Sequence, residues 1–85
     1  MRTVHKFALD VGHNRIHVPD RAEVIHVGEQ GGALHCWVDL DTLAAKVPRV
    51  IEVLTTGDSI PVPAAHLGTV VSGGFVWHAY ETDPR

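Results

Sequence analysis

A glycine pair followed by an aromatic and β-branched run, at residues 73–81, constrains the fold more than any other feature of the chain. The run reads Phe-Val-Trp-His-Ala-Tyr-Glu. In an extended strand its side chains point alternately to two faces, which is typical of a half-buried sheet. The two glycines permit the positive φ angles of a tight turn. We therefore expect residues 66–72 and 75–81 to form a β-hairpin that closes the domain.

The same period of two runs through most of the remaining sequence. Gly, Asn, Asp and Pro separate the extended segments at intervals of roughly 8–12 residues, a spacing typical of small antiparallel proteins. The pattern predicts a mainly β fold, a small antiparallel sandwich or partly closed barrel of about six to seven short strands. The expected strands cover residues 4–9, 15–18, 23–28, 33–40, 49–55, 66–72 and 75–81.

Two segments differ from simple alternation. Residues 50–54 are apolar on both faces except at Glu52, so we expect this strand near the middle of a sheet. Residues 41–47 begin with Asp41, a possible helix cap, but Pro48 ends any helix within about two turns. We expect at most one short helical turn there.

The short chain limits the size of the core. Eighty-five residues predict one domain, 1–85, and a chain of this length buries only about 60% of its unfolded surface. A small core favours sharing apolar surface with another copy, so we expect a homo-oligomer with Trp77 or Tyr80 near the contact. The sequence shows neither an apolar run of membrane-spanning length nor an export signal, and the single Cys36 excludes an internal disulfide. These features predict a cytoplasmic protein with no membrane partner.

Charge argues against one class of partner. Seven Lys and Arg oppose ten Asp and Glu, for a net charge of −3, and the basic residues do not cluster along the sequence. Binding to extended DNA or RNA needs several phosphate contacts, because counterion release supplies most of the affinity. We therefore expect no extended nucleic acid as partner. One or two arginines can still clamp a small anionic ligand.

No pattern in the sequence matches a catalytic or metal motif. His13 and His17 would lie about 13 Å apart on one strand, too far to share a zinc ion, and the other histidines are scattered. Cys36 shares a strand face with Leu34 and Val38, and apolar burial makes a thiol unreactive. We expect no catalytic residue, no metal and no cofactor.

A polar loop after the central strand is the strongest candidate for a binding site. Thr55, Thr56 and Gly57 supply hydroxyls and backbone donors, and loops on a rigid scaffold commonly carry function. Arg49 opens the same strand. A tryptophan such as Trp77 or Trp37 can stack on a base, or fill a core or subunit interface instead. The predicted ligand-binding residues are Arg49, Thr55, Thr56, Gly57, Trp77 and His78.

Several short segments give the chain a family resemblance. They are residues 6–9, 22–27, 36–38, 56–57 with 60–61, 67–69 and 74–81. In this order and with similar spacing, they resemble a widespread family of small, uncharacterised β-rich proteins of tailed phages and prophages. The most specific part is the ending, Gly-Gly-(Phe/Leu)-Val-Trp-His-x-(Tyr/Phe)-Glu. The resemblance implies a phage origin and a compact β fold, and it implies no particular activity.

Two hypotheses of function follow. Small phage proteins often blunt host defence, so by analogy the first is a non-catalytic accessory protein that sequesters a small anionic nucleotide, such as a cyclic dinucleotide immune signal. The alternative is a protein-interaction or virion-associated module without a small-molecule ligand. An enzyme is not expected.

Overall fold

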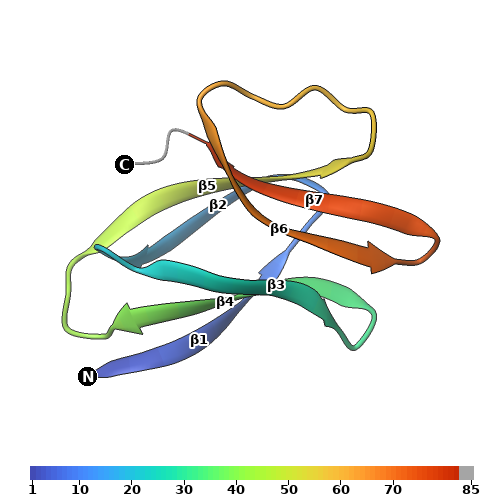
Figure 1. The fold of residues 1–85 in the computed structure, drawn as a ribbon. Helices are drawn as coiled ribbons and strands as arrows, with labels where there is room; N and C mark the ends of the chain where they lie inside the picture. Colours follow the sequence, from blue (N-terminus) through green and yellow to red (C-terminus); the bar gives the residue numbers. More distant parts are fainter. Residues whose placement is uncertain (83–85) are drawn as a thin grey trace.

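The computed structural model describes residues 1–82, which form seven antiparallel strands and no helix (Figure 1). The predicted β class is confirmed, and each expected strand is present, most of them extended by a few residues. The strands are β1 (Arg2–Leu9), β2 (Gly12–Pro19), β3 (Glu23–Gln30), β4 (Ala33–Asp41), β5 (Lys46–Thr55), β6 (Ala64–Ser72) and β7 (Phe75–Thr82).

The strands form two sheets, in the orders β1-β4-β3 and β2-β5-β7-β6. The sheets pack against each other as a sandwich and do not close into a barrel (Figure 1). Strand β5 lies between β2 and β7, so the expectation that the apolar strand is central is confirmed. The ends of this central strand define the two places where polar residues collect.

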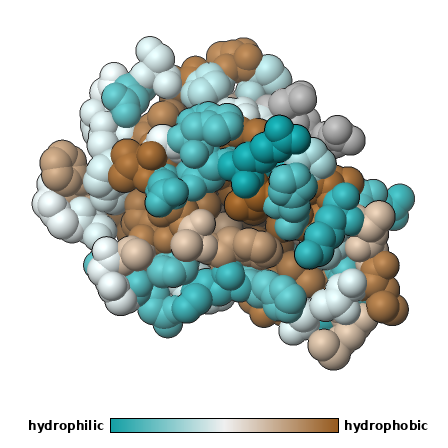
Figure 2. Space-filling view, turned by 180° about the vertical axis from the view of Figure 1, so that it is seen from behind, coloured by the Kyte–Doolittle hydropathy of each residue, from teal (hydrophilic) through white to brown (hydrophobic). Residues whose placement is uncertain are grey.

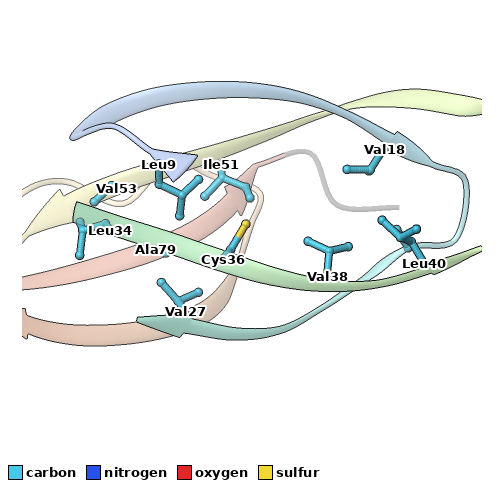
Figure 3. Packing of buried hydrophobic residues seen from close by; sticks show 11 residues of the cluster. Leu9, Val18, Val27, Leu34, Cys36, Val38, Leu40, Ile51, Val53 and Ala79 are labelled. Carbon is cyan, nitrogen blue, oxygen red and sulfur yellow. The ribbon is translucent and has the colours of Figure 1, made fainter. Parts of the chain in front are cut away.

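The core lies between the two sheets and follows the alternation of the strands. On β4, Leu34, Cys36, Val38 and Leu40 are buried while the residues between them are not. Ile51 on β5 is 1% exposed and faces them from the other sheet (Figure 3). Burial raises the pKa of the Cys36 thiol to about 11, which keeps it protonated and unreactive.

At one side of the sandwich the edge strands β3 and β6 approach closely. A bulge interrupts the pairing of β6 with β7 between His66 and Gly68. A Cβ atom at Gly68 would lie 3.0 Å from the Cβ of Val27 on β3. A larger residue at this position would require Val27 to move by a few tenths of an ångström.

The segment between β4 and β5 is a turn. The Ala44 N–H donates to the Asp41 carbonyl (3.1 Å), and the Leu43 N–H donates to Asp41 Oδ1 (3.0 Å). This carboxylate therefore caps the turn as a helix cap would, although no helix follows. The backbone bond from Leu43 holds the pKa of Asp41 below its usual value.

Pro48 lies inside β5, so the expectation that it separates a turn from the strand is wrong. The strand begins at Lys46, and Pro48 is opposite His17 of β2. Among residues 1–82, the pairing of β5 with β7 runs from Val50 to Thr55, so Pro48 lies outside the described part of this pairing. Strands tolerate proline where its nitrogen is not needed for a ladder hydrogen bond.

Strand β2 also begins earlier than expected, at Gly12. The reason is Asn14, which is 8% exposed. Its side-chain amide donates to the carbonyls of Asp10 (2.8 Å) and Ile51 (3.2 Å), and its Oδ1 accepts from the Asp10 N–H (2.7 Å). Asn14 lies outside the expected strand 15–18, yet its hydrogen bonds to the main chain of Asp10 and Ile51 hold the start of β2 in place.

The outer surface is mixed in character. Hydrophilic and hydrophobic side chains are interspersed over the face shown in Figure 2. Among residues 1–82 there is no helix of the length and apolarity needed to cross a membrane.

Candidate ligand-binding site

The structure divides five of the six predicted ligand-binding residues between two hollows, and the sixth, Trp77, lines neither of them. Arg49 and Thr55 lie six residues apart on one extended strand, which separates their backbones by about 20 Å. Arg49 lines a cavity of about 500 Å³, whereas Thr55, Thr56, Gly57 and His78 line a smaller one of about 220 Å³. The two hollows are therefore separate candidate sites.

The larger hollow, here called the arginine cavity, is lined by three arginines from three elements. Arg15 comes from β2, Arg21 from the turn between β2 and β3, and Arg49 from the first half of β5. Its other charged residues are Asp20 and Glu81. Apolar walls are supplied by Ala22, Val47, Pro48 and Val50.

Arg49 is held in a fixed position by Glu81. Its Nε and Nη2 donate to the two carboxylate oxygens of Glu81 (2.5 and 2.6 Å), and its Nη1 donates to the Ala22 carbonyl. The Glu81 side chain is only 10% exposed, and its hydrogen bond raises the pKa of Arg49 above the usual value. Three of the five guanidinium N–H groups are used in these bonds, which leaves two for a ligand.

Arg15 and Arg21 are exposed at the same cavity. Within residues 1–82, neither guanidinium takes part in a hydrogen bond or an ion pair. The main-chain N–H of Arg21 donates to Asp20 Oδ1 (3.0 Å), so only the backbone of that residue is engaged. Among the residues that the structure describes, nothing competes with an anion for these two side chains.

The smaller hollow, here called the threonine cavity, is bordered by a chain of side-chain hydrogen bonds. His78 Nε2 bonds the Thr56 hydroxyl (2.9 Å) and His78 Nδ1 bonds the Thr69 hydroxyl (3.1 Å). The Thr69 hydroxyl also bonds His66 Nε2 (2.9 Å). Asp58 Oδ2 accepts from the hydroxyl of Thr55 (3.0 Å). Because these hydroxyls already have partners, they are poorer candidates for ligand binding than the arginines.

The two tryptophans lie on different surfaces. Trp77 is half-buried, packs against the core and donates from Nε1 to the Ser72 carbonyl (3.3 Å). It lines neither cavity. Trp37 lies on the outer face of the three-stranded sheet, with His26 and His35 at ring-centroid distances of 5.3 and 6.0 Å. Core packing thus accounts for Trp77.

The histidines remain dispersed. His13 Nδ1 bonds Glu52 (2.6 Å), while His17 lies four residues further along the same strand. Over the described part of the chain, no three histidine, cysteine or acidic side chains lie close enough to hold one metal ion. The absence of a metal cofactor stays a prediction.

Sequence reasoning missed Arg15 and Arg21. Nothing in their spacing connects them with Arg49, because they lie 34 and 28 residues earlier in the chain. The antiparallel register pairs Arg15 with Val50 and Ile16 with Arg49, so the side chains of Arg15 and Arg49 leave opposite faces of the sheet, and both residues border the same cavity. The only local signal was the sequence Pro19-Asp20-Arg21, which is typical of a turn.

Comparison with known proteins gives one match. The family model described as "Domain of unknown function (DUF7352)" matches residues 1–85. No curated protein and no solved structure matches the chain.

Proposed function

The chain belongs to the DUF7352 family, and from that premise we propose that it is a non-catalytic binding protein for a small anionic, nucleotide-type ligand. The observation that carries the proposal is that three arginines, from β2, the β2–β3 turn and β5, line one cavity. Its volume of about 500 Å³ is typical of small-molecule sites. Arginine is the residue best suited to recognise a phosphate group, because its planar fork can donate two parallel hydrogen bonds.

The distribution of charge supports this proposal. The whole protein is acidic, with a net charge of −3, yet three of its seven Lys and Arg residues line one cavity. The cavity also offers apolar walls, against which the base or sugar of a nucleotide can pack. This combination suits a ligand with one charged end and one flat, less polar end.

The fixed position of Arg49 favours binding over turnover. Glu81, the most buried acid of the cavity, is bonded to Arg49 through both oxygens and is not placed as a general base. An arginine held in this way loses little side-chain freedom when an anion arrives. A passive binder of this kind suits sequestration of a nucleotide signal.

The biological role that we propose is that of a phage-encoded accessory protein. It would act in the cytoplasm of the host cell and hold a nucleotide immune signal, such as a cyclic dinucleotide, away from its receptor. The support for this role is the resemblance of residues 74–81 and the other matching segments to small phage proteins.

Arg15→Ala should weaken nucleotide binding about ten- to a hundred-fold, the effect of losing a hydrogen bond to a charged phosphate. Arg15 is exposed on β2, and within residues 1–82 its guanidinium makes no bond, so the fold should be unaffected. Calorimetry against mono-, di- and cyclic nucleotides measures the effect. Arg2→Ala, which removes a charge from the other sheet, is the control.

Two outcomes would contradict the proposal. One is the absence of heat from wild-type protein with every nucleotide at millimolar concentration. The other is an unchanged affinity in Arg15→Ala together with a loss in Thr56→Val, which would place the ligand in the threonine cavity instead.

A second candidate function, a protein-interaction module, is favoured by the tip of the β6–β7 hairpin. Val71, Phe75 and Val76 are 73%, 56% and 38% exposed there, next to one another in the strand register. Phe75 packs against Trp77 at a centroid distance of 5.3 Å, which holds its ring at the surface. Exposed apolar groups gathered at one place are typical of an interface.

On this second candidate, the protein should form a homo-oligomer through the hairpin tip. Sedimentation at micromolar concentration should show a species larger than the 9.2-kDa chain, and Phe75→Glu should convert it to monomer. Leu43→Glu, at an 85% exposed site far from the hairpin in sequence, should leave the assembly intact. A wild-type protein that sediments only as monomer would remove this prediction.

A further inference from the structure

Arg21 is the only residue other than glycine with a positive φ angle among residues 1–82, at +64°. It occupies the third position of the turn Pro19–Ala22, which is closed by a hydrogen bond from the Ala22 N–H to the Pro19 carbonyl (3.1 Å). Turns that need a positive φ at this position usually have glycine or asparagine there. The chain has an arginine instead.

This choice is unfavourable for the backbone. A side chain in the left-handed region brings its Cβ too close to the following carbonyl oxygen, and such strain persists where function requires it. Within residues 1–82 the Arg21 guanidinium makes no bond that would offset the strain. What the side chain does is line the arginine cavity.

We infer that the strained turn keeps Arg21 in place to bind the phosphate group of the ligand. The inference rests on the proposed function and names the residue that recognises the phosphate. Arg49 is already paired with Glu81, whereas among residues 1–82 the guanidinium of Arg21 has no such partner.

In the sharpest test, one substitution should raise the thermal stability of the protein and lower its affinity for the ligand. Arg21→Gly should raise Tm by roughly 2–6 °C because the strain is relieved, less the entropy that glycine adds to the unfolded chain. Arg21→Asn, which tolerates the left-handed region, should also raise Tm. Both variants should bind adenosine 3′,5′-cyclic monophosphate about ten- to a hundred-fold more weakly than wild type.

Arg21→Lys retains the charge without the planar fork, so its affinity should fall between those of wild type and Arg21→Gly. Arg2→Gln, on the other sheet, is the control for general loss of charge and should bind as wild type does. A Tm that falls in both Arg21→Gly and Arg21→Asn would show that the arginine is structural and would overturn the inference.

The ligand series keeps one base throughout. Wild-type protein should bind adenosine 3′,5′-cyclic monophosphate and adenosine 5′-monophosphate more tightly than adenosine, which has no phosphate group. Equal affinities for all three would overturn the inference that Arg21 binds the phosphate. If wild type binds none of these compounds, nor inorganic phosphate, the proposed function itself fails. If it binds them and Arg21→Gly binds equally well, only the inference about Arg21 fails.

Discussion

Arg49→Ala should lower the free energy of unfolding by about 3–5 kcal/mol, because it leaves the carboxylate of Glu81 charged and unpaired in the interior. From the sequence alone this substitution is expected to disturb ligand binding and leave the fold intact, since Arg49 opens a strand. In the structure the same arginine neutralises Glu81 and bonds the Ala22 carbonyl. Urea denaturation followed by circular dichroism measures the loss.

A matched pair of variants separates the lost pairing from lost packing. The double substitution Arg49→Met with Glu81→Leu removes both charges and keeps most of the volume, so it should recover most of the stability. Arg2→Ala breaks an exposed pair with Asp39 and should change the free energy of unfolding very little. A loss in Arg49→Ala as small as that in Arg2→Ala would mean that Glu81 is not held as described.

Ile51→Ala should destabilise the protein by about 2–5 kcal/mol, through lost burial and the cavity that remains. Ile51 is among the largest fully buried side chains and lies at the centre of β5, between the two sheets. In a domain of this size such a loss approaches the whole stability. Ile51→Val, which removes one methylene group, should cost about 0.5–1.5 kcal/mol and remain measurable if the alanine variant does not fold.

The control for Ile51 is Ile60→Ala. Ile60 is 50% exposed in the loop between β5 and β6, so its truncation should change the unfolding free energy by about 0.5 kcal/mol or less. Equal losses in Ile51→Ala and Ile60→Ala would contradict the location of the core.

The fold was predictable because strand signals are local. Alternation along β4 and the glycine pair before β7 specify a strand and a turn without reference to distant residues. The errors arose where a distant partner changes a local preference. Pro48 breaks helices, yet it lies within β5, opposite His17 of β2. Asn14 is typical of turns until the Ile51 carbonyl offers it a partner.

The candidate site was predictable only in part. Thr55, Thr56 and Gly57 are neighbours in sequence, and His78 meets them because β7 pairs beside β5. Arg49, which the sequence also predicts as an anion-binding residue, lies near the other end of β5 and lines the other cavity. Its companions Arg15 and Arg21 come from elements whose register with β5 no local pattern encodes.

The close approach at Gly68 has a consequence for the solubility of the folded chain. Strands β3 and β6 each end a sheet, and an edge strand offers unpaired N–H and C=O groups to any passing strand. Because Gly68 lets β6 lie against Val27, each of these two edges covers the other and blocks the addition of a foreign strand. A larger side chain at residue 68 would press against Val27 and loosen this contact, so we expect the missing side chain to help protect the protein against aggregation.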